Sequence, residues 1–325
     1  MLDRRGFLAA GGAAAALLGG APAGNRAEAR APLTGTQVPG FYRFPLGQFQ
    51  ITVVSDGTIS FPTEALWPEA AKADRDAVLA GDFQPTDTAT LQVNVLAVNT
   101  GDRLVLIDAG SRGKFQPTAS RLLQNLAAAD VKPEQVDTIF ITHLHPDHLW
   151  GVTDASDAER TFPNAEYVIG EAEWNFWMKP QHPLASDAFW EPVYRQNMKT
   201  VAVIKDRVRT VKPGGEVITT IATPGHTPGH TSVQIASGSD HLLCTADVIG
   251  NRAVGIQRPD WRGGFDLDLE QGAKTRRTFL ERCESERAFA SSYHLPFPGL
   301  GHIARVGTVF TWVPSDWRWE GASPT

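Results

Sequence analysis

Apolar and polar residues alternate along several short stretches of the chain, and this period of two predicts β-strands. The first stretch is "QITVVSDGTI", which begins at Gln50 and contains an Asp-Gly turn signal. The stretch "TLQVNVLAVNTGDRLVLIDAG" predicts two strands joined by a Thr-Gly-Asp turn. Further strands are predicted for "VDTIFIT", "AEYVIG", "EVITTIA", "TSVQIAS" and "HLLCTADVI", with "AFASSYH" as the last strand.

Stretches with helical spacing of apolar residues lie between these strands. They predict helices over "TASRLLQNLAAAD", "EAEWNFWM", residues 187–199 and "DLEQGAKTRRTFLERC". Strands and helices are mixed throughout, and no Pro- or Ser-rich linker divides the middle of the chain. We therefore expect a flexible arm over residues 30–40 and a single α/β (α+β) domain over residues 41–325, in which two sheets pack face to face with helices outside.

Residues 1–29 have the pattern of an export signal. A charged start with the pair Arg4-Arg5 precedes a short run of Ala, Leu and Gly, and the pair resembles that of a twin-arginine signal. Cleavage is expected after Ala23 or Ala29. A disordered tail or a membrane anchor is the alternative, but the apolar run is shorter than the roughly 20 residues that span a bilayer. We expect an exported, periplasmic protein without stable membrane insertion once the signal is removed.

Composition and charge narrow the class further. The 325 residues include 42% hydrophobic and 20% charged residues, which is typical of a globular protein with a sizeable core. The formal net charge is -6 and no basic stripe is present, so a nucleic-acid partner is not expected. Two cysteines, Cys244 and Cys283, are too few for a disulfide framework.

Candidate chemistry is concentrated in the loop "THLHPDHLWG", which directly follows the apolar run "TIFI". Three of the nine histidines, His143, His145 and His148, lie within six positions together with Asp147. A lone histidine is usually a surface or core residue with ordinary partners. Three histidines and an aspartate at this spacing instead indicate a metal site.

Three more candidate ligands follow other strands: His226 after "ITTIATPG", Asp247 after "LLCTA" and His294 after "AFASSY". We expect the four strand ends to meet at one edge, where five imidazoles and two carboxylates would converge. Two ions about 3.5–4 Å apart fit such a set. One ion would be held by His143, His145 and His226 and the other by Asp147, His148 and His294, with Asp247 as the bridge.

These motifs carry a family resemblance. "THLHPDH" resembles the H-x-H-x-D-H signature of the metallo-β-lactamase superfamily, and "TPGHTPGH", "TAD" and "SYH" follow in the order that the superfamily uses for its other ligands. The stretches "PGFYRFPLGQFQITVVSDGTI" and "HLPFPGLGHI" further resemble methyl parathion hydrolase and its lactonase and aryl-esterase relatives. The resemblance implies a four-layer αββα sandwich and two divalent metal ions, with zinc favoured and manganese, iron or cobalt also open.

The resemblance also implies roles for residues around the metals. Asp108 either orients a ligand histidine or caps a turn. His230 either hydrogen-bonds across the site or supports its loop, and the support role is favoured; His302 has the same two alternatives, a contact at the site or support of its own segment. Aromatic residues in the pocket segments of the family either line the substrate pocket or fill the core. Those expected along the pocket are Phe115, Trp177, Phe189 and Trp190.

The resulting hypothesis is a binuclear metal-dependent hydrolase in which a metal-bridging hydroxide cleaves lactones, aryl esters and organophosphate triesters. Asp147 or Asp247 would take up the proton. An acyl-homoserine lactonase, active in quorum quenching, is an alternative, although Gly250 stands where the well-known type carries a tyrosine. A non-enzymatic periplasmic metal-binding protein is the other alternative, and it would need a coordinatively closed site. A homodimer is also left open.

Removal of the bridging carboxylate tests the two-metal hypothesis. We expect Asp247→Ala to lower metal content and kcat together, because one side chain loses contact with both ions. Metal content is measured by atomic emission spectrometry, and kcat is measured with a chromogenic aryl ester. A variant that keeps two metals and full turnover would show that Asp247 is not the bridge.

Overall fold

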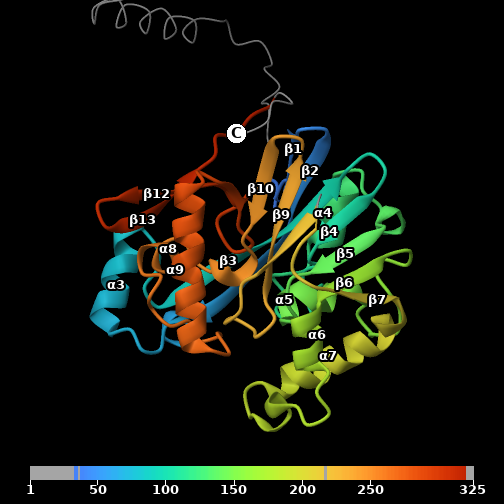
Figure 1. Cartoon of the computed structure of the whole chain (residues 1–325), viewed down its shortest axis with the longest axis horizontal. Helices are drawn as coiled ribbons and strands as arrows, with labels where there is room; N and C mark the ends of the chain where they lie inside the picture. Colours follow the sequence, from blue (N-terminus) through green and yellow to red (C-terminus); the bar gives the residue numbers. More distant parts are fainter. Residues whose placement is uncertain (1–32, 36, 216–217, 320–325) are drawn as a thin grey trace, which may run out of the picture. The chain divides into compact units, whose positions relative to one another are not determined.

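The alternating stretches form two β-sheets in the computed structural model, which describes residues 33–35, 37–215 and 218–319 (Figure 1). The chain divides into two units, Met1–Val38 and Pro39–Thr325, and all the strands and helices named below belong to the second. The predicted export signal and the first part of the predicted arm lie outside the described residues. Among the described helices, none is both long and apolar enough to cross a membrane.

The first sheet has seven strands, and each strand pairs with its neighbour in the sequence. The first four strands are antiparallel, whereas the last three continue the sheet in parallel. Parallel neighbours need crossover connections, and these carry helices. The strands are β1 (Phe41–Leu46), β2 (Phe49–Pro62), β3 (Thr88–Asn99), β4 (Leu104–Ile107), β5 (Thr138–Ile141), β6 (Glu166–Gly170) and β7 (Val208–Val211).

The second sheet has six strands from the C-terminal half of the chain. All six strands again follow the order of the sequence, and four of the five neighbouring pairs are antiparallel, whereas the pair of the third and fourth strands is parallel. A long helix connects that parallel pair. The strands are β8 (Ile218–Ala222), β9 (Thr231–Ser237), β10 (Asp240–Cys244), β11 (Phe289–Ser291), β12 (Leu300–Val306) and β13 (Val309–Pro314).

Helices cover the outer sides of the sheets, with the longest one beside the second sheet (Figure 1). Asp268 caps the N-terminus of that helix, because its carboxylate accepts the backbone N–H of Gln271 and so satisfies one free donor of the first turn. The helices are α2 (Thr63–Leu66), α3 (Lys72–Gly81), α4 (Leu122–Ala128), α5 (Pro146–Leu149), α6 (Glu171–Trp177), α7 (Glu191–Ile204), α8 (Val254–Gln257) and α9 (Leu269–Ser285).

Three layers of buried apolar side chains hold these elements together. Between the sheets, Phe44 and Ile51 of the first sheet share a cluster with Val233 and Phe289 of the second. A second cluster joins the first sheet to α4, α6 and α7, and a third joins the second sheet to α9. Burial of both faces of each sheet is the main source of stability for such a layered domain. The predicted four-layer αββα sandwich is confirmed.

Two local predictions are wrong. The Asp-Gly signal marks a β-bulge inside β2 rather than a turn, because the buried Asp56 carboxylate accepts the backbone N–H groups of Ser111 and Leu122. Gly57 has a φ of 111° there, and a Cβ would lie 2.0 Å from the carbonyl oxygen of Thr118. In addition, "AFASSYH" is not the last strand, since the hairpin of β12 and β13 follows it and forms the edge of the second sheet.

Candidate metal centre

The loop after β5 brings four polar side chains to the edge where the strands end. His143 and His145 precede α5, and Pro146 occupies the first position of that helix. Because proline is preorganised for a first helical turn, Asp147 and His148 follow in helical conformation. All four of these polar side chains are buried.

His143, His145 and His226 form the first group of candidate ligands, each with one nitrogen within 4.8 Å of the others. Nδ1 of His145 lies 2.8 Å from Nε2 of His226, so these two nitrogens face a common position. Three imidazole nitrogens are a ligand set that suits zinc and other first-row divalent ions.

Asp147, His148 and His294 form a second group within the same distance limit. Nε2 of His148 and Nε2 of His294 each lie 3.6 Å from Oδ2 of Asp147. This group combines two imidazoles with a carboxylate, and it comes from two strand ends that are far apart in the sequence.

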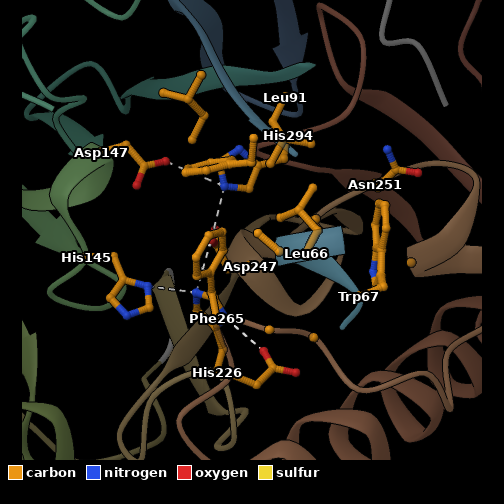
Figure 2. Close-up of a pocket in the computed structure, with 18 of the residues that line it drawn as sticks. Leu66, Trp67, Leu91, His145, Asp147, His226, Asp247, Asn251, Phe265 and His294 are labelled. Atoms are coloured by element: carbon orange, nitrogen blue, oxygen red, sulfur yellow. Dashed lines mark hydrogen bonds and ion pairs between the residues drawn. The ribbon is translucent and has the colours of Figure 1, made fainter. Parts of the chain in front are cut away.

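Asp247 lies between the two groups (Figure 2). Its Oδ1 is 3.0 Å from Nε2 of His148, and its Oδ2 is 3.1 Å from Nε2 of His294. The same Oδ2 is 3.3 Å from Nε2 of His226, which belongs to the first group. The carboxylate therefore contacts both groups, as a bridging ligand must.

Several polar atoms at the centre are buried without a hydrogen-bond partner in the described part of the chain. They include Nε2 of His143, Nε2 of His148, Oδ2 of Asp147 and Oδ1 of Asp247. Buried polar atoms in native proteins nearly always have a partner, and four unpartnered ones side by side need a common explanation. Divalent cations provide it, because these atoms are nitrogen and carboxylate oxygen donors. The residues present therefore fit a two-metal centre.

Four of the five candidate ligand histidines have their remote ring nitrogen held by a neighbour, which fixes the orientation of each ring. Asp108 accepts from Nδ1 of His148 at 2.8 Å and also from the hydroxyl of Thr142, and these contacts hold the ring of that candidate ligand. The other three partners are the Thr142 hydroxyl for His143, the Asp266 carboxylate for His226 and the Gln92 carbonyl for His294.

Asp266 was not predicted from the sequence, although it is central to the geometry. Its Oδ1 accepts from Nδ1 of His226 at 2.9 Å, and its Oδ2 accepts from Arg276 of α9 at 2.8 Å. Arg276 also donates to the carbonyl oxygens of Pro259 and Trp261. No motif signals this contact, because Asp266 is separated from His226 by 40 positions.

Glu173 of α6 is a second unpredicted residue, and it ties the two ligand loops together. Its fully buried carboxylate accepts the backbone N–H of Leu144, between two ligands, and the hydroxyl of Thr227, beside a third. The backbone N–H of Gly229 is a further donor to it at 3.2 Å. A Cβ at Gly229 would lie 2.0 Å from the backbone nitrogen of Glu173, which explains the second glycine in "TPGHTPGH".

The two other predicted histidines have different places. His230 supports its loop, because its Nδ1 pairs with the Thr223 hydroxyl and its Nε2 accepts the backbone N–H of Asp247. His302 lies on β12, where its Nδ1 donates to the carbonyl oxygen of Ala288. The structure therefore places His302 in the second sheet and away from the candidate ligands.

Protons and metal ions compete for the ring nitrogens of the candidate ligands, because the surrounding charges shift the pKa values of these groups. Burial disfavours the charged form of His226, but hydrogen bonds to Asp247 and Asp266 outweigh it and raise its pKa to about 9. Burial also acts on His148, yet the surrounding carboxylates, Asp247 first, raise its pKa well above the usual range. Burial would raise the pKa of Asp247, but the histidines around it, led by His148, hold that pKa well below its usual value.

A pocket of about 370 Å³ opens onto the centre and exposes ligands of both groups. Figure 2 shows His145 and Asp147 on one side of it and Leu66 and Trp67 on the other. Most of its remaining lining is apolar and aromatic, which suits a neutral organic ligand. The aromatic lining includes Phe61, Phe115, Phe189, Trp190, Trp261 and Phe265.

Three of the four predicted pocket aromatics, Phe115, Phe189 and Trp190, line this pocket. Trp177 does not. It is fully buried in the core outside the first sheet, and its Nε1 donates to Glu173 at 2.7 Å. The side chain thus contacts the carboxylate that supports the ligand loops and does not line the pocket.

Two packed sheets with a histidine and aspartate centre at their edge define a metal-dependent hydrolase of the αββα type. The chain belongs to the metallo-beta-lactamase superfamily, whose family model matches residues 88–291.

Solved structures similar to this chain include AidC, a dizinc quorum-quenching lactonase crystallised with a homoserine product. It is 27% identical with a TM-score of 0.81, and the match covers 86% of this chain and 98% of that one. The hydrolase AbOPH is 30% identical with a TM-score of 0.81, with coverage of 87% and 100%. An uncharacterized protein of Mycobacterium leprae is 26% identical over 185 residues, which are 55% of this chain and 77% of that protein.

Metal binding should release protons, because His226, with a pKa of about 9 in the metal-free chain, must be neutral to act as a ligand. Protons therefore compete with the metal at low pH, and we expect the apparent zinc affinity to rise from pH 6 to about pH 9. Calorimetry at pH 7.5 in two buffers of different ionisation enthalpy measures the number of protons released. Binding without proton release, or with an affinity independent of pH, would contradict the arrangement described.

Proposed function

We propose that the protein hydrolyses lactones and aryl esters with an apolar body at a two-metal centre. The observation that carries the proposal is the pocket, whose lining combines ligands of both metal groups with a wall of aromatic side chains. Similarity to AidC, a lactonase, supports the same substrate class. Zinc is the proposed metal, because three imidazoles and carboxylates suit it and AidC is a dizinc enzyme.

Bound divalent ions supply water that is ionised at neutral pH and a Lewis acid for the oxygen that becomes negative. The chain's own side chains do the rest. Phe265 and Trp190 exclude water and hold the apolar body of the substrate with its ester group at the ligand end of the pocket. The carboxylate of Asp147 lines that end of the pocket and is our candidate to take up the proton of the attacking water. The same proton then passes to the leaving alcohol.

Gly250 bears on the choice among lactones. It lines the pocket, and a Cβ there would meet nothing within 4 Å. The position at which the well-known lactonase type carries a tyrosine is therefore open space in this protein. Tyr293 does not replace it, because its hydroxyl donates to the carbonyl oxygen of Asp147. The open space leaves room for substrates with a bulky ring. The proposed mechanism therefore does not depend on a tyrosine hydroxyl at this position. Acyl-homoserine lactones remain candidate substrates within the proposed class.

A phosphotriester is the second candidate substrate. The apolar lining of the pocket suits a neutral triester and disfavours an anionic diester. Attack on phosphorus and attack on a carbonyl carbon both develop charge on an oxygen, so one site can serve both reactions. We further propose export to the periplasm, on the pattern of residues 1–29 alone.

A substrate panel tests the proposal. We expect the zinc-loaded protein to give its highest kcat/KM with dihydrocoumarin or an aryl acetate, and lower values with an acyl-homoserine lactone and methyl paraoxon. The metal-free protein is the matched control and should be inactive until zinc is restored. Absence of turnover with every substrate would contradict the hydrolase proposal, and a preference for methyl paraoxon would reverse the order of the two substrate classes.

A further inference from the structure

His145 is held differently from the other four ligand histidines. Its Nδ1 faces the position it shares with Nε2 of His226, at 2.8 Å, so Nε2 is its remote nitrogen. That Nε2 is buried and has no hydrogen-bond partner in the described part of the chain. The remote nitrogens of the other four rings each have a hydroxyl, carboxylate or carbonyl partner.

An aromatic ring takes the place of that missing partner. The ring of Trp190 is stacked on the ring of His145, with centroids 5.2 Å apart and an interplanar angle of 17°. A parallel stack limits the tilt of the smaller ring, and it gains from dispersion and from exclusion of water. A hydrogen-bond partner would normally fix the ring of a metal ligand. In the described part of the chain, the ring contacts of His145 other than this stack are with the candidate ligands His143 and His226, so the stack is its contact from outside the ligand set.

Trp190 is itself held by the start of α7. Its backbone N–H donates to the carboxylate of Asp187 at 2.9 Å, as does the backbone N–H of Phe189. The indole ring meets Phe189 edge to face at a centroid distance of 5.2 Å and Phe265 at 6.5 Å. Phe189 and Phe265 line the pocket together with Trp190. Trp190 therefore borders the pocket and also contacts the candidate ligand His145.

We propose that Trp190 is a positioning residue for the metal ligand His145, in addition to its place in the pocket wall. The wall of the substrate pocket and the three-histidine group then share one side chain. Loss of the indole ring frees His145 to tilt and weakens metal binding at that group. The proposal depends on the metal centre but not on which ester the protein cleaves.

The test is metal binding by Trp190→Leu, which keeps apolar volume but removes the stack, and by Trp190→Phe, which keeps an aromatic face. Cobalt and zinc are titrated into each metal-free variant against a competing chelator, and His145→Ala identifies the constant that belongs to the three-histidine group. We expect Trp190→Leu to weaken that constant by about 3- to 10-fold and to alter the visible absorption of the cobalt form, and Trp190→Phe to restore both.

Phe189→Leu is the matched control, because Phe189 is the adjacent pocket aromatic and its recorded ring contacts are with Trp190 and Phe265, not with a ligand. It should raise KM for an aryl ester and leave cobalt and zinc affinity at the wild-type value. Wild-type metal affinity and cobalt absorption in Trp190→Leu would overturn the proposal. So would equal losses of metal affinity in Trp190→Leu and Phe189→Leu. These readouts need no turnover, so they stand apart from the substrate panel.

Discussion

The carboxylate of Asp247 approaches four histidine rings, with oxygen to Nε2 distances from 3.0 to 3.8 Å. Buried ionisable groups are costly unless neighbours of opposite charge or metal ions compensate them. At this centre the Asp247 carboxylate lies among imidazole rings. Its negative charge must therefore be compensated by protons on those rings or by bound cations. The backbone around Asp247 holds this carboxylate in place. Ala246, the preceding residue, has a φ of 45°, and Nε2 of His230 accepts the backbone N–H of Asp247.

The double sheet provides the rigid edge on which this compensation depends. Ligands come from the ends of β5, β8, β10 and β11, which belong to both sheets, so the core between the sheets fixes their relative positions. Side chains outside the ligand set add the finer control. Asp108 holds the ring of His148, and Asp266 holds the ring of His226. Glu173 joins the two loops that carry these rings. The rate of hydrolysis in such sites depends on this prior organisation, because little reorganisation is then needed during reaction.

Sequence patterns predicted the layered fold and assembled all seven candidate ligands, because alternation marks strands and ligand motifs follow strand ends. They failed where a contact joins residues that carry no local signal. Asp266 and Glu173 are ordinary acidic residues in the sequence, and only the fold brings them to His226 and Leu144. For Trp177 the family resemblance left two places open, the pocket and the core; the indole N–H donates to the buried Glu173 carboxylate, and the ring lies in the core.

Anomalous X-ray diffraction from crystals of the zinc-loaded protein, recorded above and below the zinc absorption edge, tests the two-metal centre most directly. We expect two anomalous peaks about 3.5–4 Å apart with the Asp247 carboxylate between them. One peak should be bound by the three-histidine group and the other by the group of Asp147, His148 and His294. A single peak, or two peaks of which only one contacts Asp247, would contradict this expectation.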